Sequence, residues 1–231
     1  MTWRLQLTHR FSSKLTAKIS TLYSHTTRLF VVNPVIEPGG AGSLLLSNRG
    51  SSRYHEYEFT VDYRAGEEAT FSMSYVRSDS RGDLNTTDNI FVPLEVPVIR
   101  PDVYASLPSD VPNRLTGFGL IKMPWGFTLS PAVDLHSGFP YSNVDVLQNY
   151  AGEANSQRYP IFFELNWRIY RDFPLPFHIH PGHKFRFGVY SINTTGRQNP
   201  TAVYNNITSP MFGQFTGLGK RVNGIVIEFA D

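Results

Sequence analysis

The sequence predicts an all-β protein: an antiparallel transmembrane β-barrel segment of about nine long strands. Hydrophobic residues recur at every second position over most of the chain, which is the spacing of a strand with two unlike faces. The strands extend to about nine to eleven residues, the length at which a tilted strand crosses a bilayer. Strands of soluble proteins usually have about five or six residues. Short connections also alternate with long ones along the chain.

Each strand follows from this alternation, taken in chain order. In the first, Trp3, Leu5 and Leu7 alternate with polar residues. The fifth is the least regular, because Phe118 and Leu120 break its alternation. No run has the periodicity of a helix. The nine strands are centred on residues 3–8, 15–23, 56–63, 71–75, 115–123, 127–136, 163–169, 185–190 and 225–229.

The connections between these strands fall into two classes. The short ones cover residues 11–14, 64–68 and 124–126, and residues 172–183 form an intermediate connection on the same side. The long ones cover residues 25–52, 78–113, 138–161 and 194–219. In outer-membrane barrels short turns lie at one rim and long loops at the extracellular rim. A soluble β-sandwich has no reason to segregate its connections in this way.

Composition narrows the function classes. The 231 residues carry 21 Lys+Arg and 19 Asp+Glu, a formal net charge of +2, and this near-neutral balance disfavours nucleic acid as a partner. Cysteine is absent, which excludes disulfide scaffolds and thiol chemistry. With 41% hydrophobic residues, the chain has too much apolar surface for a disordered protein.

The two faces of the predicted strands suit two environments. The apolar face would contact the lipid bilayer, with aromatic belts at the membrane interfaces formed by Trp3, Tyr23, Tyr63, Tyr75 and Trp167. The other face would line a wet or plugged lumen. Its charged residues could steer a ligand, contact a plug or pair with one another. The lumen-facing and ligand-binding candidates are Glu56, Glu58, Asp62, Asp134, Glu164, Arg168 and Arg186, and Glu228 lies on the same face.

Nine strands do not complete a barrel. Bacterial single-chain barrels have an even number of strands, and an open edge leaves backbone N–H and C=O groups unpaired in hydrocarbon. We therefore expect residues 1–231 to be the C-terminal part of a larger barrel, without its plug domain and signal peptide.

Four segments, in order, resemble the C-terminal barrel of TonB-dependent outer-membrane receptors, in the Oar-like group that carries a carboxypeptidase-regulatory-like domain. They are Met123–Phe127 (family turn LPFGF), His136–Tyr141 (SGxPF), Arg158–Phe173 (R(Y/F)PxFxxLDLRxxKDF) and Asn199–Phe215 (NP…NI.SP.FGQ). The match is good from about Arg114 to the end of the chain and generic before it.

This resemblance implies a plugged barrel of about 22 strands in the outer membrane of a Gram-negative bacterium. Such a receptor binds a scarce small extracellular ligand and imports it with energy passed through TonB. The implied partners are TonB, the protein's own N-terminal plug and the barrel-assembly machinery, for which Phe229 near the C-terminus would be the assembly signal. The resemblance implies no cofactor and no catalytic residue. The alternatives are a self-standing small barrel, structural or acting as a narrow pore, and a soluble all-β binding or adhesion module.

Four other patterns are weaker candidates. His178, His180 and His183 have metal-like spacing but no nearby carboxylate or cysteine, so a polar turn is the better interpretation. Asp134, His136 and Ser137 superficially suggest a hydrolytic triad, although Ser137 should point to the opposite face. Residues 79–89 offer oxygens to calcium without EF-hand spacing and are expected to form a solvated loop. The adhesion alternative rests on Arg81-Gly82-Asp83.

Overall fold

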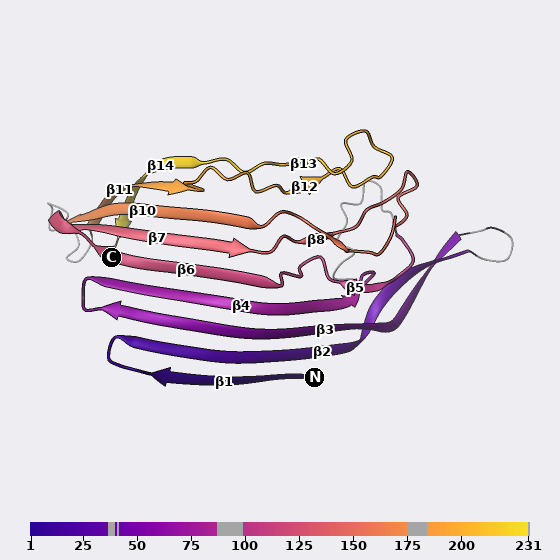
Figure 1. The fold of residues 1–231 in the computed structure, drawn as a ribbon, viewed down its shortest axis with the longest axis horizontal. Helices are drawn as coiled ribbons and strands as arrows, with labels where there is room; N and C mark the ends of the chain where they lie inside the picture. The colour runs from indigo at the N-terminus through magenta and orange to yellow at the C-terminus, as the bar shows by residue number, and fades with distance from the viewer. Residues whose placement is uncertain (37–39, 41, 87–98, 175–183, 231) are drawn as a thin grey trace.

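The computed structural model describes residues 1–36, 40, 42–86, 99–174 and 184–230. One antiparallel sheet dominates it, and its nine long strands follow the predicted order (Figure 1). The all-β fold class and the nine strands are therefore confirmed. Along the sheet they are β1 (Thr2–Arg10), β2 (Leu15–Ile36), β3 (Gly42–Ala65), β4 (Ala69–Asp83), β6 (Asn113–Lys122), β7 (Phe127–His136), β10 (Phe162–Pro174), β11 (Lys184–Ile192) and β14 (Val222–Ala230).

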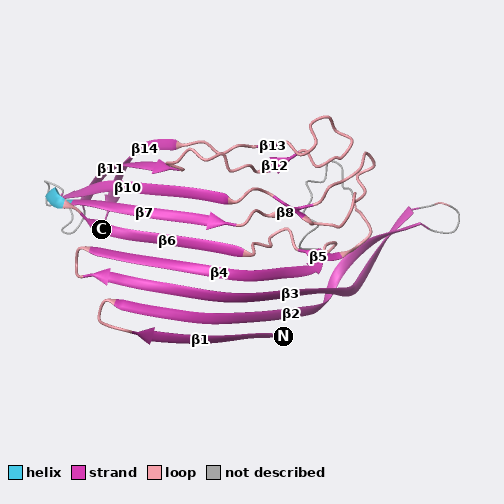
Figure 2. Ribbon diagram, viewed as in Figure 1, coloured by secondary structure: helices cyan, strands magenta, loops and turns pink. Residues whose placement is uncertain are grey.

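Small elements occupy the connections (Figure 2). The strand β5 (Tyr104–Ser106) pairs with β4, β8 (Pro140–Tyr141) with β9 (Gln157–Arg158), and β12 (Ala202–Val203) with β13 (Phe215–Thr216). The 3-10 turn η1 (Pro124–Gly126) joins β6 to β7. Within the described residues, no helix has the length and apolar character needed to cross a bilayer.

Short and long connections lie at opposite ends of the sheet, as predicted. The turns at residues 11–14, 66–68 and 123–126 share one end, which we call the short-turn end (left in Figure 1). The described residues of the connections between β4 and β6 (84–86 and 99–112), between β7 and β10 (137–161) and between β11 and β14 (193–221) share the other, the long-loop end. The chain begins at the long-loop end and finishes at the short-turn end, because an odd number of antiparallel strands separates its termini.

The prediction of a long loop at residues 25–52 was wrong, because β2 and β3 continue as a hairpin as far as Ile36 and Gly42. β-branched and apolar residues on both arms favour extended pairing, and the register includes Val32 opposite Leu46. The register shifts near Leu29, where Arg28 adopts a φ of 61°. The structure therefore has a projecting β-hairpin where a long loop was predicted.

The register places the predicted apolar side chains on one face. One row of cross-strand neighbours runs through Leu7, Ile19, Phe59, Tyr75, Leu115, Leu135 and Phe163. It also explains the irregular fifth strand, because Phe118 pairs with Ser72 and Leu120 with Thr70 on the polar face. On the apolar face, β6 instead contributes a glycine without a side chain, Gly117, which lies between Met73 and Val133.

This sheet is a single layer without a hydrophobic core beneath it. The accessible surface of the whole chain is 15318 Å², whereas a compact chain of 26.2 kDa exposes about 10,600 Å². Among the described residues only Val31 and Val144 are buried hydrophobics, and both lie toward the long-loop end. Leu5 and Leu7, each 68% exposed, show how open the apolar face is. An apolar surface of this extent needs a covering phase or partner.

The strands are staggered as in a barrel wall. A row of neighbours joins Ala17, Val61, Met73, Gly117, Val133 and Leu165. Ala17 lies two residues from the short-turn end of β2, whereas Val133 lies six residues from that of β7. This shift of four residues over four strand spacings corresponds, at about 3.3 Å per residue and about 4.8 Å per strand, to a tilt of about 35°. Closed transmembrane barrels have tilts of about 35–45°.

We expect Leu165→Arg to destabilise the folded protein by about 2–4 kcal/mol, because it places a charge on the apolar face near mid-strand. Ala132→Arg is the matched control, since Ala132 lies on the polar face of the neighbouring strand, opposite Asn166. Its cost should be below about 1 kcal/mol. Urea unfolding of both variants in lipid vesicles measures the difference, and equal costs would contradict the assigned faces.

Candidate functional site: the polar face of the sheet

The polar face carries a network centred on Glu58 of β3. The carboxylate lies 3.4 Å from both Arg4 and Lys18, and it accepts hydrogen bonds from Ser20 at 3.0 Å and from Ser74 at 3.1 Å. These partners come from three strands, β1, β2 and β4. Glu58 is therefore compensated within the sheet itself.

A second network lies on the last three strands. Arg186 donates two hydrogen bonds to Asp172, at 2.7 and 2.9 Å, and its guanidinium lies 4.2 Å from the centre of the Tyr170 ring. Arg168 pairs with Glu228 and also lies over Tyr170, at 5.1 Å. Two arginines and two carboxylates thus alternate around one tyrosine ring, which is a self-neutralising arrangement.

The remaining predicted candidates are also paired. Arg114 holds Asp134 through two hydrogen bonds, at 2.7 and 3.2 Å. Hydrogen bonds join Tyr54 to Glu56, Ser72 to Asp62 and Asn166 to Glu164. All seven candidates share the polar face, and the structure gives each a partner within the chain. Their role toward a ligand stays a prediction.

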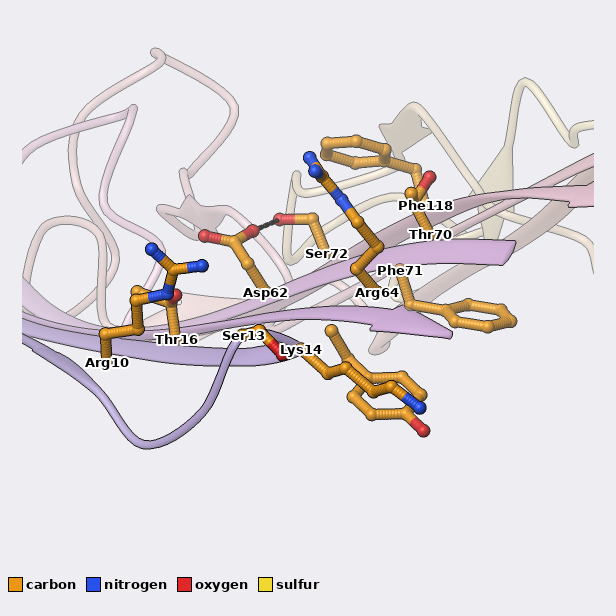
Figure 3. Close-up of a pocket in the computed structure, with 11 residues that line it drawn as sticks. Arg10, Ser13, Lys14, Thr16, Asp62, Arg64, Thr70, Phe71, Ser72 and Phe118 are labelled. Atoms are coloured by element: carbon orange, nitrogen blue, oxygen red, sulfur yellow. Dashed lines mark hydrogen bonds between the residues drawn. The ribbon is translucent and has the colours of Figure 1, made fainter. Parts of the chain in front are cut away.

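An open hollow of about 580 Å³ lies at the short-turn end (Figure 3). Arg10, Lys14 and Arg64 bring positive charge to it, and Phe118 exposes its ring there. Arg10 and Arg64 stand on opposite sides of Asp62, which is hydrogen-bonded to Ser72 (Figure 3). The cations therefore do not converge on one point.

A more enclosed cavity of about 320 Å³ lies where the polar face meets the long loops. Aromatic side chains line it: His136, Phe139, Tyr159 and Phe162. His136 stacks on Phe162, with ring centroids 4.6 Å apart and planes at 10°, and contacts Phe139 edge-on at 5.4 Å. Burial, and after it the neighbouring Tyr141, raises the pKa of Tyr159 above its ordinary value of 10. We call this space the aromatic cavity.

Two buried polar contacts hold the walls of the aromatic cavity. Arg158 pairs with Asp110, which is only 2% exposed, and donates to the Gly138 carbonyl at 3.1 Å. The Asp110 carboxylate also accepts the Ser80 amide at 2.8 Å. The Asn199 side chain bonds both the amide and the carbonyl of Phe163, at 3.1 and 2.9 Å. Loop segments far apart in sequence are thus fixed to the sheet.

Sequence reasoning did not identify this cavity, although its signal was present. Three of the motif segments meet there, through Gly138 and Phe139, through Tyr159 and Pro160, and through Asn199 and Pro200. A β-carbon at Gly138 would lie 1.8 Å from the Tyr159 carbonyl oxygen, so only glycine allows this approach. The motifs are therefore neighbours in space as well as in order.

The suggested hydrolytic triad is not assembled. The Asp134 carboxylate is held by Arg114, and Nδ1 of His136 lies 2.8 Å from the Ser137 carbonyl oxygen rather than from Asp134. The hydroxyl of Ser137 accepts from Asn113 at 3.2 Å. These bonds direct the three side chains to separate partners.

The prediction that residues 79–89 form a solvated loop was wrong for residues 79–83, which belong to β4. Pairing with β3 on one side and β5 on the other extends the strand. Arg81-Gly82-Asp83 is therefore strand and not a loop tip. A β-carbon on Gly82 would lie 2.9 Å from Ser52 Cβ, and Asp83 accepts the Ser51 amide at 2.5 Å. Among the described residues, no cluster of three His, Cys, Asp or Glu could hold a metal ion.

The predicted histidine group and the predicted assembly signal remain to be placed. His178, His180 and His183 lie outside the described residues. Phe229 lies in β14 on the apolar face, 75% exposed and edge-on to Phe185 at 6.1 Å. Its role in assembly stays a prediction.

Comparison with known proteins finds similarity in structure and not in sequence. No protein-family model matches the chain, and no curated protein sequence does. Among solved structures, the outer membrane transporter YddB from Escherichia coli is similar, with a TM-score of 0.60 and 7% sequence identity. The match covers 98% of this chain and 32% of the transporter, so the chain spans about a third of its length. At this identity the likeness shows the fold alone: the antiparallel sheet of this chain is arranged like a part of that transporter's structure.

We expect Arg158→Met to loosen the long-loop end by about 3–5 kcal/mol, because it leaves the buried Asp110 carboxylate without its cation. Adding Asp110→Asn should recover part of this loss, since the amide is neutral and still accepts the Ser80 N–H. Hydrogen exchange of residues 137–161 in both variants provides the measurement. Equal loss in the single and double variants would contradict the role given to Asp110.

The stability of residues 99–107, which contact the β2–β3 hairpin through Asp102 and Asn33, is expected to depend on pH. Burial, and after it the nearby Asp83 carboxylate, raises the pKa of Asp102 above its ordinary value of 3.8, despite a hydrogen bond from the Asn85 amide. The folded loop thus holds the proton more tightly than the unfolded loop does. The stability that protonated Asp102 adds to the folded loop is therefore complete below pH 3.8. It is lost as the pH rises through the raised pKa. Exchange protection of residues 99–107, corrected for intrinsic rates, should fall over that interval and stay level in Asp102→Asn.

Proposed function

We propose that this chain is a section of the wall of an outer-membrane transporter. The observation that carries the proposal is the tilted single-layer sheet, whose exposed apolar face stands opposite a charge-paired polar face. Lipid would cover the apolar face, and the polar face would line the lumen. The segregated connections and the similarity to an outer membrane transporter support the same assignment.

Further strands would complete the barrel. β1 and β14 are the two edges of the sheet and do not pair with each other in the described structure. Each edge presents a row of backbone groups that hydrocarbon cannot satisfy. We propose that the chain is the C-terminal part of a larger barrel, and that its partner strands join at these edges.

The finer proposal is uptake of a scarce extracellular ligand with energy passed through TonB. The motif segments that resemble TonB-dependent receptors support it, because three of the four meet around one cavity at the long-loop end. A plug, TonB and the barrel-assembly machinery would be the partners of the whole protein. The proposal assigns no catalytic step to this chain.

Neither alternative is favoured by an observation. A self-standing small barrel needs closure, whereas β1 and β14 lie at opposite edges. An adhesion module acting through residues 81–83 needs an exposed tip, whereas these residues lie within a strand that is paired on both sides.

Single cysteines test the orientation, because the chain contains none. Leu147, 76% exposed, lies in a long loop, and Glu67 is exposed in a short turn. In intact cells a membrane-impermeant maleimide should label Leu147→Cys but not Glu67→Cys, and both should react after lysis. Labelling of both in intact cells would exclude the membrane-spanning arrangement.

The TonB step has its own test. Site-specific crosslinking in cells should join the whole protein to TonB. Surface labelling of the Leu147→Cys variant, as above, first shows that the protein is correctly inserted. Correct surface labelling without any TonB adduct would retain the barrel wall and remove the energised uptake.

A further inference from the structure

The aromatic cavity has the dimensions of a ligand site. Its volume of about 320 Å³ is near the lower end of the roughly 300–1,000 Å³ found for small-molecule sites. His136 is only 8% exposed, whereas Phe139 is 45% exposed. The cavity therefore has a buried wall and an open side, with room for about one ring.

The buried wall offers one hydrogen-bond acceptor. Nδ1 of His136 lies 2.8 Å from the carbonyl oxygen of Ser137. A carbonyl only accepts, so in the neutral imidazole Nδ1 carries the proton and Nε2 has a free lone pair. An acceptor within an aromatic wall favours a ligand that has both a hydroxyl group and apolar C–H surface.

The sheet adds polar groups beside this wall, outside the residues that line the cavity. Arg114 is the cross-strand neighbour of His136 on β6, and its guanidinium holds Asp134 at 2.7 Å. Arg114 and Asp134 have side-chain exposures of 51% and 29%. Their remaining donor and acceptor positions can meet hydroxyl groups on the edge of a ligand.

The orientation of the rings distinguishes a puckered ligand from a flat one. Among the described ring pairs at the cavity, His136 and Phe162 are parallel but stack directly on each other. Phe139 stands at 62° to His136. These two walls meet at an angle and offer no slot for a flat aromatic ring between parallel faces. They suit a ring that has C–H bonds on its faces and hydroxyls around its edge.

We propose that the aromatic cavity binds one pyranose unit of an extracellular carbohydrate. The ring packs against Phe139 and Tyr159, one hydroxyl donates to Nε2 of His136, and the Arg114–Asp134 pair on the adjoining sheet meets hydroxyls that extend past His136. The inference rests on the proposed function for one point, that the long-loop end faces outside. Binding itself requires only the folded chain.

Saturation-transfer NMR on the detergent-solubilised whole protein tests the proposal. The probes are methyl α-D-glucopyranoside, methyl α-D-mannopyranoside, methyl β-D-galactopyranoside and phenol. At least one glycoside should show transfer to its ring protons. Phe139→Ala removes a wall, and His136→Asn keeps a donor for Ser137 but has no atom at the Nε2 position. Each variant should weaken that binding by about three- to ten-fold.

Phe212→Ala is the matched control, because Phe212 is 44% exposed in a loop and does not line the cavity. It should bind like the parent protein. Unboiled gel migration confirms that each variant is folded before it is compared.

Three results would overturn the inference. They are no glycoside binding to the parent protein, glycoside binding to Phe139→Ala and His136→Asn that equals binding to the control Phe212→Ala, or binding of phenol alone. None of these bears on the cysteine labelling. Failure of the carbohydrate site and failure of the barrel orientation are therefore distinguishable.

Discussion

The constraint on which the rest of the structure depends is the pairing of backbone groups along one antiparallel ladder. The ladder joins nine strands in sequence order, with irregular register in the β2–β3 hairpin. Once each N–H and C=O has its partner, side chains must alternate between two faces. A one-residue slip would send Leu165 to the polar side and Glu164 to the apolar side, so the register and the two environments fix each other.

Charge pairing on the polar face follows from this alternation. Cross-strand neighbours lie within reach of one another, so Glu58, Asp134 and Arg186 each meet an opposite charge from an adjacent strand. Exposed pairs of this kind contribute little stability individually. Their consequence is electrostatic, because a face that neutralises its own charges can border a lumen without a strong field of one sign. The short-turn end, with Arg10, Lys14 and Arg64, is the exception.

The two ends of the sheet are built on different principles. Tight turns close the short-turn end, and at Trp125 and Gly126 the backbone adopts φ of 62° and 77° to do so. Tertiary contacts organise the long-loop end: the Asp110–Arg158 pair, the bonds from Asn199 and small two-stranded sheets. A loop that is stapled to rigid strands can hold side chains in a fixed arrangement, which a mobile loop cannot. The aromatic cavity lies where these staples converge.

The sequence by itself determined the strands, their order, their two faces and the separation of short turns from long connections, because all of these follow from periodicity and turn residues that are local in the chain. It also placed the seven charged candidates on one face. Only the tertiary structure decided their partners, the extension of β2, β3 and β4 beyond the expected length, and the position of Phe118 on the polar face. It alone brought His136, Phe139 and Tyr159 around one cavity. These features depend on register and on contacts between distant segments, and period-two alternation carries no information about which residue lies opposite which.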